Sequence, residues 1–385
     1  MQISYLDNSA TTPVDKRVLK EMFPYFSDKY GNPSSMHSKG LEAKQAVDSA
    51  RKNIAKIIEG DEKEIIFTSG GTESVNLAIK GVALANMEKG NHIITTKIEH
   101  HAVLEVCKYL QEFEGFEITY VDVQKNGIVE LRDIEKAIKK NTILISVMYA
   151  NNEIGTIQPI KEISEIAKKH KIIFHTDACQ AGCYLDLNVK NLGVDLMTLN
   201  GGKIYGPKGV GCLYVKKDLI LIPLLHGGEQ EFGVRSGTEN VPSIVGFAKA
   251  LEIAQQMREK ESKRLIKLRD YLAKELIKKI PQSQINGDMK ERLPNNVNIS
   301  IYGVEGESML LHLDSKGICA STGSACSSHS LEPSHVIMAL GLPIEASHGS
   351  LRFSLGRFTI KEDVDKVIKE LPKIVKQLRE ISPLK

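Results

Sequence analysis

Short apolar runs alternate with longer amphipathic segments along the chain up to about residue 215. The apolar runs predict β-strands at residues 65–68, 92–95, 117–121, 143–148, 172–175, 196–199 and 211–215. Apolar residues at helical spacing predict helices at residues 41–58, 73–87, 102–112, 131–139 and 160–170. Because the runs are short, nearly all apolar and mostly separated by helices, they indicate an α/β fold. We expect a mostly parallel seven-stranded sheet that helices cover on both faces.

The pattern changes in the C-terminal part of the chain. Residues 247–280 form one long charged segment whose apolar positions keep a stripe on one side, which predicts a single long helix. Thr359, with Glu362 three residues later, predicts the start of the last helix. Two further strands are expected, at residues 298–301 and 352–354. The expected domains are a large one, residues 15–255, and a smaller α+β one, residues 1–14 and 256–385.

Composition excludes several classes of protein. The 385 residues carry a net charge of only +3, which argues against a nucleic-acid-binding surface. The sequence has no apolar run of about 18 residues that would span a membrane, and its N-terminus lacks the apolar core of a signal peptide. The six cysteines include no C-x-x-C pair and give no disulfide framework in a chain this long. We therefore expect a reduced, cytoplasmic protein that binds neither membranes nor nucleic acid.

Two of the predicted strands end in residues that suit one cofactor. Asp177 follows the strand at residues 172–175, and Lys203 follows the strand at residues 196–199. In open α/β sheets, ligands bind at such strand ends. Pyridoxal phosphate needs a lysine for its Schiff base and a carboxylate for its ring nitrogen. This pair of residues therefore favours a pyridoxal-phosphate site, with an ordinary surface lysine as the alternative.

Other polar positions have roles that the residues alone leave open. The turn at residues 68–73 fits a phosphate-binding helix start or an ordinary tight turn. His100 fits a histidine that stacks on a cofactor and carries protons, or an exposed histidine at a strand end. The turn around Asn152 fits an amide that binds an anionic oxygen or a plain polar turn. Arg352 fits a carboxylate site or a structural ion pair.

The segment at residues 320–329 consists almost entirely of small and polar residues, so we expect it to be exposed and flexible. Cys326 lies in this segment and is expected to be a reactive thiol rather than a packing residue. The packing role suits four other cysteines, at positions 107, 179, 183 and 212. A zinc site at Cys326 and His329 would lack further ligands at suitable spacing, so we expect no metal site in the isolated chain.

Several motifs together carry a family resemblance. They lie at residues 5–7, 9–13, 31–33, 67–74, 151–155, 203–209, 235–238, 323–326 and 352–357. In this order they resemble the motifs of cysteine desulfurases of the NifS/IscS class, within the pyridoxal-phosphate-dependent class-V aminotransferase family. The resemblance extends over essentially the whole chain. The sequence around Cys326 and the length of its loop are similar to the NifS/IscS branch rather than the SufS branch.

The resemblance implies a type I fold, like that of aspartate aminotransferase, and a homodimer. It implies that Lys203 forms the Schiff base with the cofactor and that Asp177 contacts the ring nitrogen. His100 would stack on the ring and move protons, and Gln180 with Asn152 would reach the ring oxygen. The residues implied to hold the phosphate are Gly71, Thr72, Asn200, Gly202 and, from the partner subunit, Thr238.

The resemblance also implies how substrate and sulfur are handled. Arg352 and Asn152 would bind the carboxylate of L-cysteine, and Cys326 would accept the sulfur. The products would be L-alanine and a persulfide on Cys326, which supplies sulfur for iron–sulfur cluster assembly or tRNA thiolation. The acceptor, an iron–sulfur scaffold or another protein, stays open, as does ligation of a partner's iron–sulfur cluster by Cys326.

One departure from the family pattern concerns the phosphate. Where the family usually has Ser-Gly-His-Lys, this chain has Asn200-Gly201-Gly202-Lys203, so a phosphate-binding histidine is missing. Asn200 can still donate a hydrogen bond and the Gly202 N–H can contribute. We expect weaker retention of the cofactor rather than loss of activity.

Three other functions are weighed against a cysteine desulfurase. A selenocysteine lyase or another pyridoxal-phosphate-dependent lyase would have no need of Cys326. A non-catalytic scaffold for sulfur assembly would have no need of Asp177 and Lys203. A nucleotide-binding oxidoreductase would use the turn at residues 69–72, but the chain has neither the G-x-G-x-x-G nor the Walker pattern.

Overall fold

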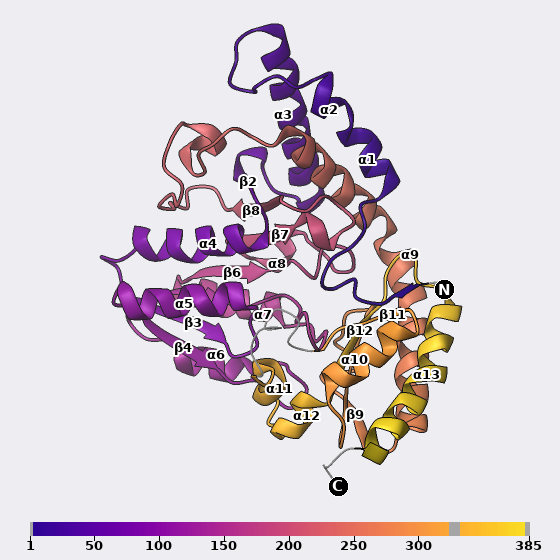
Figure 1. Ribbon diagram of the computed structural model, residues 1–385. Coiled ribbons are helices and arrows are strands. Elements are labelled where there is room, and N and C mark those ends of the chain that lie inside the picture. The colour runs from indigo at the N-terminus through magenta and orange to yellow at the C-terminus, as the bar shows by residue number, and fades with distance from the viewer. Residues whose placement is uncertain (1–2, 323–331, 382–385) are drawn as a thin grey trace.

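The computed structural model of this chain describes residues 3–322 and 332–381. Its centre is a seven-stranded sheet in the order β2-β8-β7-β6-β5-β3-β4 (Figure 1). The strands are β2 (Ile65–Thr68), β3 (His92–Thr96), β4 (Glu117–Val121), β5 (Thr142–Ser146), β6 (Ile173–Asp177), β7 (Leu196–Asn200) and β8 (Gly211–Val215). Strand β8 runs antiparallel to β2 and β7, and the other pairs are parallel. The predicted α/β fold is confirmed.

The strands are apolar throughout because both faces of the sheet are buried. Successive side chains of a strand point to opposite faces of the sheet. In β3, Ile93 belongs to one apolar cluster and Ile94 to the other, and in β5 the same holds for Leu144 and Ile145. Helices α4 (Gly71–Ala85) and α5 (His101–Phe113) cover the first face. The second is covered by α3 (Ser38–Ile58), α6 (Leu131–Ala137), α7 (Ile160–His170) and α8 (Val189–Leu192). Short helices complete this part of the chain: α1 (Lys16–Met22), α2 (Pro24–Ser27), η1 (Glu62–Glu64), η2 (Gly201–Lys203) and η3 (Gln230–Gly233).

Helix α9 (Val241–Lys279) links the central sheet to a second apolar core. Its first half contributes Phe247 and Leu251 to the core of the large sheet, and its second half contributes Leu265 and Leu272 to the other core. A three-stranded antiparallel sheet of order β12-β10-β9 packs there. The remaining elements are β9 (Ser283–Ile285), β10 (Asn296–Ile301), α10 (Gly306–Ser315), β11 (Ile318–Cys319), α11 (His335–Ala339), α12 (Ile344–His348), β12 (Ser350–Ser354) and α13 (Lys361–Ile381).

The N-terminal arm, residues 5–12, connects the two parts. Strand β1 (Ser4–Tyr5) pairs with β11, and Leu6 belongs to the second core. Further along the arm, the Thr12 hydroxyl donates a hydrogen bond to the carbonyl of Gly202, which follows strand β7 of the large sheet. Figure 1 shows this N-terminal segment passing from the small sheet towards the large one. The boundaries proposed for the domains, residues 15–255 against 1–14 and 256–385, stay a prediction.

The predicted start of the last helix was wrong by two residues. Helix α13 begins at Lys361, and the Asp363 carboxylate accepts a hydrogen bond from the Ile360 N–H at 3.0 Å. The Thr359 hydroxyl instead accepts from the Gly356 N–H at 2.8 Å, closing the preceding turn. Asp363, rather than Glu362, therefore satisfies a donor at this helix start. Among the helices of the described part of the chain, none is both long and apolar enough to cross a membrane.

Candidate active site

A cavity of about 300 Å³ lies at the carboxyl ends of the parallel strands. It brings together residues that the sequence places far apart: Gly71, Thr72, His100, Asn152, Asp177, Gln180, Asn200, Lys203 and Arg352. Gly202 lines an adjoining cavity, described below. Thr238 lines neither and is exposed, and Cys326 lies outside the described residues.

Asp177 and Lys203 reach this cavity from neighbouring strands. Asp177 is the last residue of β6, and one of its carboxylate oxygens accepts the Cys179 N–H at 2.9 Å. Lys203 ends the short helix η2, whose first turn is capped when Asn200 Oδ1 accepts the Gly202 N–H at 2.9 Å. The Lys203 Nζ donates to the Ala10 carbonyl at 2.5 Å. The site therefore holds an amine and a carboxylate at two fixed strand ends.

The cap at η2 bears on the expected phosphate ligands. Because the Gly202 N–H is used by Asn200 Oδ1, this backbone donor is engaged within the chain. The amide nitrogen of Asn200 lies towards the start of α4, since a Cβ added to Gly71 would come within 3.3 Å of it. Asn200 thus offers its N–H₂ donors on the side where α4 begins.

His100 is held in one tautomer. It is the N-cap of α5, and its Nδ1 accepts the Ala102 N–H at 3.0 Å, so the ring proton of the neutral form is assigned to Nε2. Burial lowers the pKa of His100, with Lys203 acting in the same direction. The ring is therefore neutral at pH 7 and offers an Nε2–H donor at the cavity.

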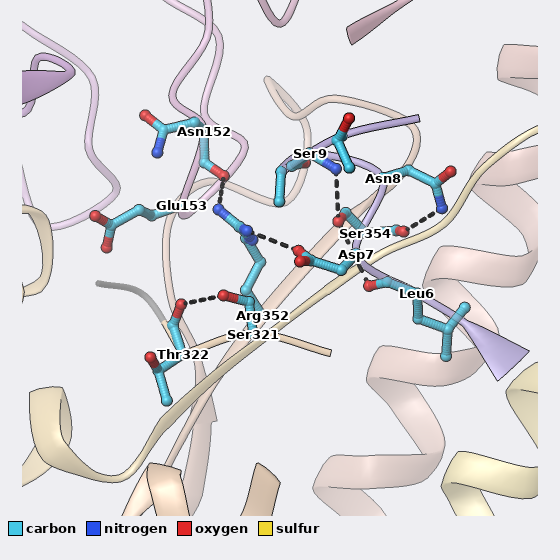
Figure 2. A network of polar contacts seen from close by, with 12 residues as sticks. Leu6, Asp7, Asn8, Ser9, Asn152, Glu153, Ser321, Thr322, Arg352 and Ser354 are labelled. Atoms are coloured by element: carbon cyan, nitrogen blue, oxygen red, sulfur yellow. Dashed lines mark hydrogen bonds and ion pairs between the residues drawn. The ribbon is translucent and has the colours of Figure 1, made fainter. Parts of the chain in front are cut away.

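Arg352 makes the ion pair that was the alternative to a carboxylate site, and it also lines the cavity. Figure 2 shows its guanidinium between the carboxylate of Asp7 and the carbonyl of Asn152, at 2.8 and 3.0 Å. Its side chain is only 4% exposed. The Nε atom is buried with no hydrogen-bond partner in the described part of the chain. The fork thus has a fixed orientation and a donor left over.

The N-terminal arm had no predicted role and proves to form one wall of the site. The Ser9 carbonyl accepts a hydrogen bond from Gln180 Nε2 at 3.0 Å, next to the Ala10 carbonyl that receives Lys203. Thr12 accepts the Tyr205 N–H at 2.8 Å, two residues beyond the lysine. The conspicuous polar run at residues 7–12 was the signal for this role, but its contacts are with residues more than 160 positions away.

Two buried carboxyl groups beside the site were also missed. Burial raises the pKa of Glu99 to about 8 and that of Glu153 to about 7. Glu99 accepts a hydrogen bond from the Met148 N–H at 3.0 Å, and Glu153 accepts one from the Ser334 hydroxyl at 2.5 Å. Glu99 directly precedes His100, and Glu153 directly follows Asn152, which are both predicted site residues. Glu99 is therefore mostly protonated at pH 7.

The donor set fits pyridoxal phosphate. The cavity combines an amine, a carboxylate, a neutral imidazole and a guanidinium. Beside it, α4 starts at Gly71 without a side-chain cap, so its first N–H groups face the adjoining cavity as donors for an anion. Gly71 itself has no room for a side chain, because a Cβ there would come within 2.7 Å of the Cys179 sulfur.

The family is decided by comparison with known proteins. The Aminotransferase class-V family matches residues 4–367. The chain belongs to this family. A protein of Dictyoglomus turgidum named cysteine desulfurase IscS is 55% identical over 381 residues, which are 99% of this chain and 96% of that protein. This similarity confirms the predicted NifS/IscS-class cysteine desulfurase.

Solved structures agree with this assignment. A NifS-like protein superposes with a TM-score of 0.92 at 39% identity, covering 98% of this chain and all of the other. SspA in complex with cysteine superposes with a TM-score of 0.81 at 37% identity, covering 93% of this chain and all of the other. The predicted pyridoxal-phosphate-type fold is therefore confirmed as well.

Proposed function

We propose that this cysteine desulfurase binds pyridoxal phosphate in the cavity between β6, β7 and α4 and takes the sulfur of L-cysteine onto Cys326. The observation that carries the proposal is the meeting of Asp177, Lys203 and Arg352 in one cavity. A carboxylate for the ring nitrogen, an amine for the aldehyde and a guanidinium for the amino-acid carboxylate are the groups this chemistry requires. The similarity to SspA, whose structure contains cysteine, supports the choice of substrate.

The chain's residues divide the work as follows. When bound, pyridoxal phosphate supplies an electron-accepting ring for charge that develops at the substrate's α-carbon. Asp177 would keep the ring nitrogen protonated, and Lys203 would anchor the aldehyde and then take the α-proton on its Nζ. His100 would cover the ring and offer its Nε2–H, and Gln180 and Asn152, which line the same cavity, would donate amide N–H groups to the ring oxygen.

The sulfur step involves Arg352 and Cys326. Arg352 lines the cavity with its guanidinium held by Asp7 and the Asn152 carbonyl, and this guanidinium binds the substrate carboxylate. The Cys326 thiolate attacks the substrate sulfur, so an S–S bond forms while the substrate's C–S bond breaks. L-Cysteine and the Cys326 thiol thereby become L-alanine and the Cys326 persulfide, with no external oxidant or reductant.

We also propose a homodimer in which the partner subunit's Thr238 joins the phosphate site. Large apolar side chains gather on the segment from α1 to the start of α3, each more than half exposed in the single chain: Phe23, Phe26, Tyr30, Met36 and Leu41. Figure 1 shows this segment at one end of the molecule. A second copy would cover this apolar surface. The sulfur then passes to an acceptor protein, such as an iron–sulfur scaffold.

The test is to locate the sulfur. The purified protein, reconstituted with pyridoxal phosphate, is exposed briefly to L-cysteine and then analysed by intact mass, peptide mapping and an alanine assay. One added sulfur on Cys326 with an equal amount of alanine is the expected result. Alanine with free sulfide and no sulfur on Cys326 would instead indicate a lyase that releases sulfide directly. No bound cofactor and no alanine would contradict the enzyme altogether.

Replacing Arg352 with lysine is expected to raise the KM for L-cysteine by roughly 10- to 100-fold, because an ammonium group cannot make the bidentate contact of a guanidinium. The value of kcat should fall much less, since the lost contact serves binding. Steady-state kinetics measure both constants, and cofactor absorbance checks that the site is intact. A variant with unchanged KM would show that Arg352 serves only its ion pair with Asp7.

A further inference from the structure

A second cavity, of about 250 Å³, adjoins the first and shares its wall at Gly71, Thr72 and Asn200. The start of α4 forms one side, and Gly202 and Lys208 form another. The backbone N–H groups of the first turn of α4 face this second cavity. The phosphate of the proposed cofactor therefore fits there. The residue here to which neither sequence nor comparison gives a role is Lys208.

Sheet topology places Lys208 at this cavity. Strand β8 runs antiparallel between β2 and β7, so it enters the sheet at the edge where they leave it, with Gly211 opposite both Thr68 and Asn200. The entry is close-packed: a Cβ on Gly211 would come within 2.9 Å of the Gly70 backbone. Lys208, three residues before Gly211, is thereby held beside the start of α4.

The amine of Lys208 is oriented by the N-terminal arm. Its Nζ donates a hydrogen bond to the Thr12 carbonyl at 3.1 Å. An ammonium group has three donors, so others remain for an anion. Gly202 leaves space beside the Lys208 side chain. A Cβ on residue 202 would lie 3.6 Å from Lys208 Cγ, so a larger side chain there would pack against Lys208 in the wall of the cavity.

Of the charged side chains that line the cavity in the described chain, Lys208 is the one left to neutralise a bound phosphate. A phosphate monoester carries about −1.5 to −2 charges at pH 7. Of the two lysines that line the cavity within the described chain, Lys203 is assigned to the aldehyde. The Glu73 carboxylate also lines it but forms an ion pair with Arg235 at 2.8 Å, and this pairing together with the Ser69 N–H lowers its pKa despite burial.

We propose that Lys208 binds the phosphate group of the cofactor, in the role of the histidine that this chain lacks at position 202. The proposal rests on the proposed function, because it takes the ligand of the cavity to be pyridoxal phosphate. The expectation that Gly202 weakens retention of the cofactor stays a prediction, and under this proposal Lys208, from the following turn, supplies a contact on the phosphate side.

The experiment compares pyridoxal phosphate with pyridoxal, which lacks the phosphate. The cofactor-free full-length protein is titrated with each, and binding is followed by the absorbance of the lysine-bound ligand. Lys208→Ala is expected to raise the Kd for pyridoxal phosphate roughly 10-fold or more, the effect of losing a hydrogen bond to a charged group. Its Kd for pyridoxal should match that of the unchanged protein. Lys208→Arg should keep most of the affinity, and Lys168→Ala, an exposed lysine of α7, is the charge-matched control.

Two outcomes would overturn the proposal. Unchanged affinity of Lys208→Ala for pyridoxal phosphate would show that the lysine does not bind the phosphate. An equal loss of affinity for pyridoxal phosphate and pyridoxal would show that Lys208 does not contact the phosphate but acts by its hydrogen bond to Thr12 of the N-terminal arm. Failure of the unchanged protein to bind either ligand would instead contradict the proposed function itself.

A double variant tests whether Lys208 replaces the histidine that is missing at position 202. Gly202→His should raise the affinity for pyridoxal phosphate, because Gly202 lines the cavity and a Cβ at this position meets no atom closer than 3.5 Å. In that background, Lys208→Ala should cost clearly less affinity than in the unchanged protein, since two groups then share one phosphate. Equal costs in both backgrounds would refute the replacement of histidine by lysine.

Discussion

Lys203→Ala is expected to abolish the conversion of L-cysteine to L-alanine, with kcat falling by roughly 10³-fold or more. A positioned general base alone contributes about 10²–10⁴-fold, and Lys203 also anchors the cofactor. Among the described residues that line the two cavities, the other lysine is Lys208, whose Nζ donates to the Thr12 carbonyl on the phosphate side and is therefore not placed to replace Lys203.

The measurements are alanine production and the visible absorbance of the bound cofactor at saturating pyridoxal phosphate. The variant should still bind the cofactor non-covalently, through Asp177 and the phosphate side, but without the absorbance of the lysine-bound form. Lys168→Ala serves as the control because it removes the same charge from an exposed helix position. Residual turnover above about a hundredth of the unchanged enzyme would contradict the role given to Lys203.

The meeting of Asp177 and Lys203 at neighbouring strand ends was predictable because it depends on local sequence. Short apolar runs buried on both faces identify β6 and β7, and the polar residues directly after them must lie at the ligand-binding edge. Asp177 and Lys203 could therefore be named from the pattern, before any resemblance was used. The topology also follows from the sequence to this extent, since alternating strands and helices require a mostly parallel sheet.

Contacts made over long sequence separations were not predictable. The arm touches Gln180 and Arg352, which lie 171 and 345 residues from their partners Ser9 and Asp7. The pKa values of Glu99 and Glu153 depend on burial by tertiary packing, which no local pattern encodes. Lys208 was visible in a family motif, but its place at the phosphate side follows only from the antiparallel insertion of β8.

Burial makes the thiols of the described part of the chain poor candidates for accepting the sulfur. The nucleophile must be a thiolate, which requires exposure or a nearby positive group. Five of the six cysteines lie among the described residues, and burial raises the pKa of every one of them: Cys107, Cys179, Cys183, Cys212 and Cys319. These five thiols are therefore protonated at pH 7 and poor nucleophiles, which agrees with the proposal that Cys326 accepts the sulfur.

Cys326→Ser is accordingly expected to eliminate the protein-bound persulfide, because none of the five described thiols is a thiolate at pH 7. Cofactor binding and the spectral change on adding L-cysteine should stay intact, since Lys203 and Arg352 are untouched. Peptide mapping after brief exposure to L-cysteine measures the sulfur. Cys319→Ser, at a half-buried cysteine that does not line the cavity, is the matched control that should keep full persulfide formation. If Cys326→Ser formed a persulfide on Cys179, which lines the cavity, the sulfur would be accepted inside the site and the assignment of Cys326 would be wrong.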